Sequence, residues 1–348
     1  MSYSLNKTLI AVLASTLLFN SLIASAIPEK NYQQTYQAVI TPFFQSGKPF
    51  RFKSHDDKYL LSAIRFTHPN PKGIVVVLPG MSEHWLKYLE VFHELHSNGY
   101  SVFSYDHRGQ GLSPHLNPKY KQALYVDSFD DYTKDLNSFL TSITSTPEKQ
   151  NQPMFLVAHS MGAGIAFDYL TRFKSPFTGV AFSAPMFDIA TKPVPRKITQ
   201  IYADLSVLLN WGEHYPIGQG DDDCNHSFSE TKVTSSLARW QMANLICHDH
   251  PESVIGGPSI QWVKEALDQA DRITRFRKSP MIETQLLNLL IIQAGIEHFV
   301  INEAQEEICS KMHRCKLVKL PDSRHEILME RDSIRAPALK MILDHFEK

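Results

Sequence analysis

The fold is decided by the stretch Phe155-Leu156-Val157-Ala158-His159-Ser160-Met161-Gly162. Its apolar start predicts a buried strand, and a helical pattern runs from about Met161 to Phe173 directly after it. A serine at such a strand-to-helix turn, with small residues two positions before and two after it, matches the GxSxG elbow that exposes a nucleophile. Ala158 replaces the first glycine and is the smallest substitute for it. We therefore predict that Ser160 is a nucleophile at the carboxyl ends of the strands, the alternative being a serine that only caps the helix.

Strand and helix patterns alternate on both sides of this turn. Short runs of β-branched or aromatic residues predict strands, and amphipathic stretches between them predict helices. Such alternation is typical of βαβ units around a mainly parallel sheet, so the sequence predicts an α/β fold. The predicted strands cover residues 74–78, 100–105, 155–157, 180–183, 287–293 and 316–320.

Residues 188–280 do not keep this alternation. They contain Trp211, Trp240 and Trp262, two cysteines and many polar residues. We interpret this interval as an insertion that lies over the sheet and not as a separate, linker-bounded domain.

Composition and charge exclude several classes of protein. Of 348 residues, 43% are hydrophobic and 20% are charged, which is typical of a globular chain and not of a disordered or collagen-like one. Lys plus Arg number 35 and Asp plus Glu number 36, giving a formal net charge of −1. Without a basic excess, nucleic acid is not an expected partner.

The N-terminus has the pattern of a secretory signal. Lys7 precedes a mostly apolar run over residues 9–23, and Ala24-Ser25-Ala26 supplies the small residues of a cleavage site. We predict a signal peptide over residues 1–26 and export of the mature chain to the periplasm or the extracellular space. An uncleaved membrane anchor is the alternative, although polar residues interrupt the run.

The cysteines fit an exported protein. An even number in an oxidising compartment is typical of disulfides. Their spacing favours two local pairs, Cys224 with Cys247 and Cys309 with Cys315, over the other connectivities. Four free, buried thiols are the alternative.

A nucleophilic serine needs a base and an acid, and in elbow hydrolases both follow it in the chain. His325 is the candidate base, because it follows the last predicted strand by a short loop and precedes the final helix. Glu297, just beyond the strand over residues 287–293, is the preferred acid. Asp188 and Glu303 remain alternatives. The oxyanion donors are expected to be the backbone N–H groups of Met81 and Met161.

These motifs together resemble the monoacylglycerol lipase and lysophospholipase group of the α/β-hydrolase superfamily, and above all its bacterial lysophospholipases. Residues 79–84 resemble the group's HG-x-x-EH loop, with Pro79 in place of histidine. Residues 106–113 match its D-x-R-G-x-G-x-S loop. Glu297 stands where the group has aspartate, and His325-Glu326 resembles its terminal histidine motif.

The resemblance implies an α/β-hydrolase core over residues 27–187 and 281–348, with residues 188–280 as a helical lid that binds an acyl chain. It implies a serine esterase that releases fatty acid from a single-chain lipid, with lysophospholipid preferred and monoacylglycerol or a short-chain ester as alternatives. The lipid is the expected partner. From its N-terminal pattern, the mature chain is expected to be either soluble or peripheral at a membrane.

The sequence also bears on whether the protein is catalytic and whether it binds a cofactor or a metal. A non-catalytic binding protein on the same fold is the alternative of another class. We expect no cofactor and no metal, because His248-Asp249-His250 and the acidic residues 221–223 lack a complete ligand set and are predicted to be solvated loops.

Overall fold

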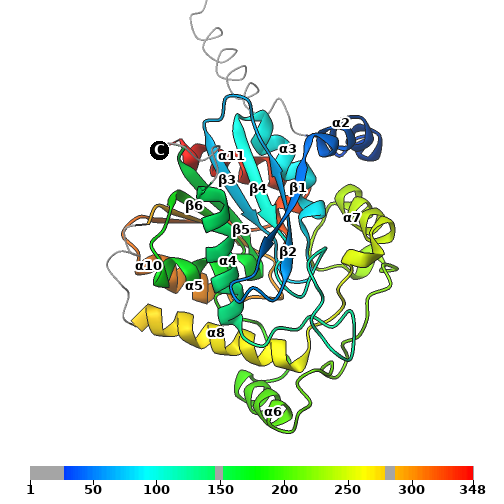
Figure 1. The fold of residues 1–348 in the computed structure, drawn as a ribbon, viewed down its shortest axis with the longest axis vertical. Coiled ribbons are helices and arrows are strands. Elements are labelled where there is room, and N and C mark those ends of the chain that lie inside the picture. The colour runs from blue at the N-terminus through cyan, green and yellow to red at the C-terminus, as the bar shows by residue number, and fades with distance from the viewer. Residues whose placement is uncertain (1–26, 146–151, 279–286, 348) are drawn as a thin grey trace, which may run out of the picture.

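Eight strands form one sheet in the computed structural model, which describes residues 27–145, 152–278 and 287–347. Their spatial order is β1-β2-β4-β3-β5-β6-β7-β8 (Figure 1). The first two strands pair antiparallel, β2 pairs antiparallel with β4, and all later pairs are parallel. The strands are β1 (Lys48–Lys53), β2 (Leu60–Phe66), β3 (Gly73–Leu78), β4 (Tyr100–Tyr105), β5 (Met154–His159), β6 (Phe177–Ser183), β7 (Leu289–Ala294) and β8 (Cys315–Leu320).

Helices cover both faces of the sheet because its central strands are apolar on both faces. In β3, Ile74 and Val76 contribute to one hydrophobic core, whereas Val75 and Val77 contribute to the other. The first core also contains residues of α4 (Phe129–Thr144), α5 (Ser160–Arg172), α8 (Ile260–Lys278) and α10 (Asn302–Ser310). The second contains residues of α2 (Tyr32–Ser46), α3 (Leu89–Ser97), α7 (Leu237–Asp249) and α11 (Asp332–Phe346).

The parallel sheet and its alternating helices confirm the predicted α/β fold, with every predicted strand present to within a few residues. The antiparallel strands β1 and β2 and the helix α2 were not predicted. Strand β1 lies at the edge of the sheet and carries exposed charged residues, so it lacks the apolar run that marks the central strands. The predicted signal peptide, residues 1–26, lies outside the described residues.

The chain between β6 and β7 is helical and contains α6 (Arg196–Leu208), α7 and α8, with one-turn 3₁₀ helices at Phe228–Glu230 and Pro251–Ser253. Figure 1 shows α6 and α8 beyond the carboxyl ends of the strands, and α7 beside α2. None of the helices among the described residues is both long and apolar enough to cross a bilayer.

Two disulfides join the local pairs that the spacing favours. Cys224 is bonded to Cys247, and Cys309 is bonded to Cys315. The first closes a loop within the stretch between β6 and β7, and the second links the end of α10 to the start of β8.

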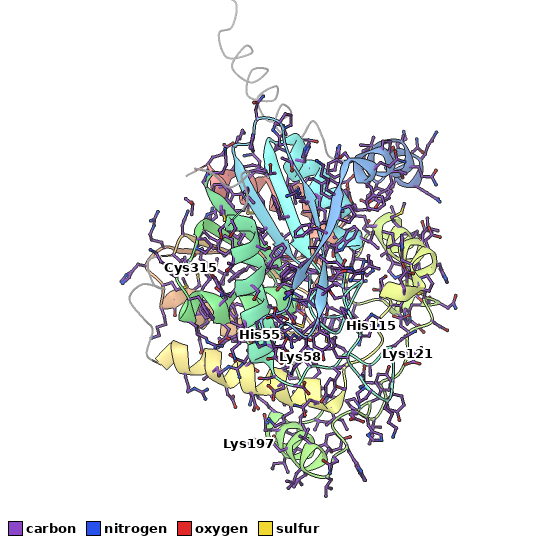
Figure 2. All side chains as sticks on the ribbon, in the orientation of Figure 1. His55, Lys58, His115, Lys121, Lys197 and Cys315 are labelled. Carbon is purple, nitrogen blue, oxygen red and sulfur yellow. A yellow bond between two sulfur atoms is a disulfide. The ribbon has the colours of Figure 1, made fainter. Side chains whose placement is uncertain are left out.

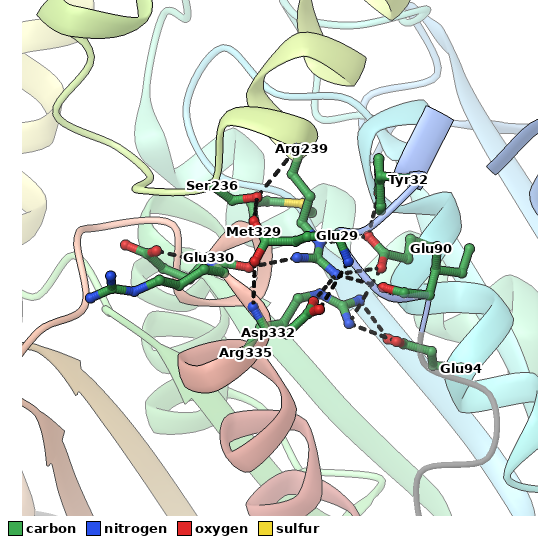
Figure 3. A network of polar contacts seen from close by, with 12 residues as sticks. Glu29, Tyr32, Glu90, Glu94, Ser236, Arg239, Met329, Glu330, Asp332 and Arg335 are labelled. Atoms are coloured by element: carbon green, nitrogen blue, oxygen red, sulfur yellow. Dashed lines mark hydrogen bonds and ion pairs between the residues drawn. The ribbon is translucent and has the colours of Figure 1, made fainter. Parts of the chain in front are cut away.

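A buried ion network attaches α7 to the rest of the chain (Figure 3). Arg239 of α7, which is 4% exposed, donates to both carboxylate oxygens of Glu90 at 2.9 and 3.0 Å. It also donates to Asp332 and to the backbone carbonyls of Ile27 and Glu330. One side chain thus connects α7 with α3, with the start of α11 and with the N-terminal segment.

Replacing Arg239 by methionine is expected to lower the free energy of unfolding by about 3 kcal/mol, because the buried Glu90 carboxylate would lose its two-point ion pair. It would keep only the hydroxyl of Tyr32 and the guanidinium of Arg335, which lies 3.5 Å away. Urea unfolding followed by circular dichroism measures this loss. The matched control is Lys340→Met, which removes an exposed pair with Asp344 and should change stability by less than about 1 kcal/mol. Equal losses in the two variants would contradict the structural role of Arg239.

Candidate active site

Ser160 begins α5 directly after β5, at the predicted turn. Its φ is 49°, in the left-handed region that a residue with a side chain seldom adopts. A Cβ added to Gly162 would lie 2.4 Å from the carbonyl oxygen of Pro79, so the turn requires glycine there. Ala158 is fully buried and pairs with its neighbours in β3 and β6. The sheet therefore accepts alanine at the first small-residue position.

Ser160, His325 and Glu297 form one chain of hydrogen bonds. The Oγ of Ser160 lies 2.9 Å from Nε2 of His325, and Nδ1 of the same ring lies 2.7 Å from Oε2 of Glu297. The side chains of His325 and Glu297 are only 8% and 4% exposed. This arrangement orients an imidazole between a hydroxyl and a carboxylate, as a general base requires.

The loop after β7 fixes the Glu297 carboxylate. Its other oxygen, Oε1, accepts the backbone N–H groups of His298 at 2.8 Å, Phe299 at 2.7 Å and Val300 at 3.3 Å. Burial raises the pKa of Glu297, but the hydrogen bond and the charge of His325, together with these N–H groups, outweigh it. The pKa of this carboxyl therefore lies below its ordinary value, and Glu297 is ionised at neutral pH.

The two alternative acids lie elsewhere. Oδ1 of Asp188 accepts its neighbour's N–H, from Ile189, and faces Nε of Arg196 at 3.3 Å. Glu303 is exposed in the first turn of α10. Of the three carboxylates weighed from the sequence, the geometry brings Glu297 into contact with His325.

The two predicted oxyanion donors flank Ser160. Met161 is the second residue of α5, so its N–H is one of the four that a helix leaves without an internal partner. Met81 lies in the turn after β3 and lines the same cavity as Ser160. A Cβ added to the preceding Gly80 would lie 3.3 Å from the Cβ of Ser160, which shows how closely this turn approaches the serine.

Polar side chains fix this turn in place. Oε2 of Glu83 accepts the N–H of Gly80 at 2.5 Å and the hydroxyl of Tyr88 at 2.6 Å. The amide of Gln110 donates to the carbonyls of Gly80 and Glu83. These contacts were not predicted, although both residues lie in motifs that the sequence analysis quotes.

The loop after β4 is itself anchored. The fully buried Asp106 carboxylate accepts the N–H groups of Trp85 and Leu112. Burial raises the pKa of Asp106 to about 7, against the opposing effect of these two N–H groups. Arg108 forms a two-point ion pair with Asp135 of α4 at 2.6 and 2.8 Å. The D-x-R-G-x-G-x-S loop therefore supports the oxyanion turn without lining the site.

Two rings pack against His325. The ring centroids of His159 and Phe299 lie 4.8 and 5.1 Å from its own. Burial lowers the pKa of His159 to about 4; the Glu83 charge opposes this shift and His325 adds to it. Nδ1 of His159 lies 3.1 Å from the carbonyl oxygen of Ser183. His159 is therefore neutral at pH 7 and adds no positive charge beside His325.

Ser160 and His325 line a cavity of about 830 Å³ whose wall is mostly aliphatic and aromatic. This volume lies within the range of pockets that enclose one small ligand. Of the three tryptophans in residues 188–280, Trp262 lines the cavity, whereas Trp211 is 58% exposed. The other apolar lining residues of this stretch are Ile189, Ala190, Pro193, Val194, Ile198, Tyr202, Ala203, Pro216, Ile217, Val233, Pro258, Ile260 and Val263.

One local prediction was wrong. His248 and Asp249 lie in the last turn of α7 and not in a loop, because the helix continues past Cys247 to Asp249. The acidic residues 221–223 do lie in a loop, where Asp222 accepts the N–H of Cys224 and contacts His226.

The sequence and the fold of this chain are similar to those of known hydrolases. The chain is 28% identical over 323 residues to the probable lysophospholipase L2 of Haemophilus influenzae, covering 92% of this chain and 98% of the relative. It is 28% identical over 330 residues to lysophospholipase L2 of Escherichia coli K12, covering 89% and 90%. The crystal structure of a soluble variant of monoglyceride lipase from Saccharomyces cerevisiae matches with a TM-score of 0.66 and 19% identity, over 83% of this chain and 93% of that one. This likeness shows a shared α/β-hydrolase fold.

The family model described as serine aminopeptidase, S33, matches residues 69–332. This match covers most of the sheet, the elbow serine, the acid loop and the histidine loop. The chain therefore belongs to the Hydrolase_4 family, as a member with the α/β-hydrolase fold.

Proposed function

We propose that this protein is a cofactor-free serine ester hydrolase that releases fatty acid from single-chain lipids, and that its preferred substrates are lysophospholipids. The observation that carries the proposal is the Ser160–His325–Glu297 chain at the wall of a largely apolar cavity. The relatives named lysophospholipase L2 match nearly the whole chain and support the choice of lipid.

The reaction follows from the geometry. His325 Nε2 takes the proton of Ser160 as Oγ attacks the acyl carbonyl, and Glu297 stabilises the imidazolium that forms. The N–H groups of Met81 and Met161 stabilise the oxyanion of the tetrahedral intermediate. His325 returns the proton to the leaving alcohol oxygen, which leaves an acyl-enzyme on Ser160. Water, deprotonated by His325, then releases the fatty acid and restores the hydroxyl of Ser160.

The cavity wall supports an acyl chain as the bound group. Aliphatic and aromatic side chains from both the core and residues 188–280 surround Ser160, and such a wall excludes water from an apolar ligand. We propose that residues 188–280 act as the lid of this cavity. Monoacylglycerol and short-chain esters are the alternative substrates, and the family's description adds peptides to the set to be tested.

We also propose peripheral contact with a membrane through α6. This helix presents large apolar side chains to solvent, with Leu205 53%, Leu208 76% and Ile201 57% exposed. Ile198 and Tyr202, on the same helix, line the cavity, so a lipid surface at α6 would meet the cavity's mouth. Lys197 projects from α6 (Figure 2) and can contact anionic headgroups.

The variant Leu205→Gln/Leu208→Gln is expected to bind less strongly to vesicles of phosphatidylethanolamine and phosphatidylglycerol in a flotation assay. Its activity on a soluble short-chain ester should be unchanged, because neither residue lines the cavity. Equal flotation of the wild type and the variant would contradict membrane contact through α6.

Export is proposed from the N-terminal pattern of residues 1–26. The two disulfides support it, because stable disulfides are typical of oxidising compartments.

The experiment that tests the function measures hydrolysis of four substrates by residues 27–348 at matched concentration, as acid release from the three esters and as amine release from the fourth substrate. They are a lysophospholipid, a monoacylglycerol with the same acyl chain, a short-chain ester and an aminopeptidase substrate, each with Ser160→Ala as the control. We expect the highest kcat/KM on the lysophospholipid. A higher value on monoacylglycerol would select that alternative, and Ser160-independent release, or none, would reject the proposal.

A further inference from the structure

Three charged side chains form a bridge beside the active site. The ammonium of Lys87, in the 3₁₀ turn Trp85–Tyr88, lies 2.8 Å from Oε1 of Glu83 and 2.5 Å from Oε1 of Glu326. All three side chains are largely buried, with 15%, 6% and 11% of their surfaces exposed. No step of the proposed mechanism uses Lys87.

At one end of this bridge, Glu83 holds the turn after β3 that contains Gly80 and Met81. While Oε1 pairs with Lys87, Oε2 accepts the N–H of Gly80 at 2.5 Å. Gly80 directly precedes Met81, so Glu83 holds the peptide next to the one that carries the proposed oxyanion donor. A shift of the Glu83 carboxylate would therefore move the backbone on which the Met81 N–H depends.

At the other end, Glu326 holds the loop that carries His325. Glu326 directly follows His325, and its N–H donates to the carbonyl of Val233 at 2.8 Å. Its carboxylate is held by Lys87, so both contacts restrain the backbone from which the His325 ring projects. Residues 87 and 326 are 239 positions apart, so this contact joins two loops that are distant in the chain.

Lys87 supplies the one positive charge that contacts both carboxylates of the bridge. Burial raises the pKa of Glu326 although Lys87 opposes it, whereas the Lys87 ammonium lowers the pKa of Glu83 despite burial. Without Lys87, two carboxylates would face each other at a site with little solvent, where an unpaired charge is strongly unfavourable. If they separate, a loop moves. If one takes up a proton, the repulsion falls, but the two loops still lose the ammonium that now joins them.

We propose that Lys87 is a positioning residue that fixes the distance between the oxyanion turn and the catalytic histidine loop. The inference rests on the proposed function, because it assigns a role to Lys87 only if Ser160 and His325 act together.

The test measures the second-order rate constant with which a fluorophosphonate labels Ser160. Mass spectrometry of the intact protein follows the labelling over time. Ser160 Oγ forms a bond to phosphorus, fluoride leaves, and His325 takes the hydroxyl proton, so the rate reports the activation of Ser160 without any choice of lipid. Lys87→Met should lower this rate by about 10- to 100-fold, since misplacement by about 1 Å has effects of this size. The kcat on a p-nitrophenyl ester should fall in parallel, with little change in KM.

Four further variants separate positioning from stability. Lys87→Arg should recover most of the rate, and Lys87→Met/Glu326→Gln should recover part of it by removing one of the two carboxylate charges. Lys340→Met, which breaks the exposed pair with Asp344, should label at the wild-type rate. Should Lys87→Met fail to fold, Glu326→Gln, which keeps Lys87 and Glu83 paired, should still lower the rate severalfold.

A folded Lys87→Met protein that labels as fast as the wild type would overturn the inference alone. A double variant that labels no faster than Lys87→Met would also overturn it. So would a fall in kcat/KM that comes from a higher KM while kcat is unchanged. A wild-type protein that does not label at Ser160 would overturn the proposed function, and the inference with it.

Discussion

Ser160→Ala is expected to reduce kcat for ester hydrolysis by about 10⁴-fold or more, because alanine has no oxygen that could form the acyl-enzyme. The structure places the hydroxyl 2.9 Å from Nε2 of His325, in position to lose its proton. Hydrolysis is measured as fatty-acid release under saturating substrate, with the protein purified free of endogenous esterases.

The same variant should keep the fold and the affinity for a product fatty acid. Alanine removes only the oxygen, and the apolar cavity wall is unchanged. Its melting temperature should lie close to that of the wild type, and calorimetric titration with the fatty acid should give a similar Kd. Activity above about 1% of wild type would show that Ser160 is not the nucleophile.

Glu297→Gln is expected to reduce kcat by about 10³- to 10⁴-fold with a much smaller change in KM. An amide at this position can donate to Nδ1 of His325, which would favour the tautomer whose Nε2 carries the proton and cannot accept one from Ser160. The amide also lacks the charge that stabilises the imidazolium. Steady-state kinetics on a p-nitrophenyl ester measures both parameters.

Asp188→Asn is the matched control, since it neutralises the alternative acid by the same change of atoms. Asp188 faces Arg196 and the backbone of Ile189, so its loss should leave kcat within a few-fold of wild type. If the Asp188 variant lost more activity than the Glu297 variant, the assignment of the acid would be reversed.

The sequence was most informative where one short segment determines both structure and chemistry. The elbow around Ser160 requires a buried strand, small neighbours and a helix, and each requirement leaves a local mark. His325 could be placed for the same reason, because it follows a recognisable strand. The acid stayed open among Glu297, Asp188 and Glu303, since only the folded loop shows which carboxylate meets the imidazole.

The sequence was least informative about contacts between distant segments. Lys87 is an ordinary lysine until the fold brings Glu326 against it. The attachment of α7 through Arg239 and Glu90 joins residues 149 positions apart. The aromatic content of residues 188–280 likewise did not show that Trp262 faces the cavity while Trp211 faces solvent. No local pattern distinguishes these cases, because each depends on which surfaces pack together.

The placement of the two disulfides has a consequence for how the protein responds to its redox surroundings. Cys224 and Cys247 both belong to the stretch between β6 and β7, and Cys309 and Cys315 both belong to the sheet and its helices. Neither bond crosses from one part to the other. Noncovalent contacts, such as those by which Arg239 attaches α7, therefore hold the helices between β6 and β7 on the rest of the chain. In reducing surroundings, each part would lose its own internal cross-link. The contacts that hold the two parts together would remain.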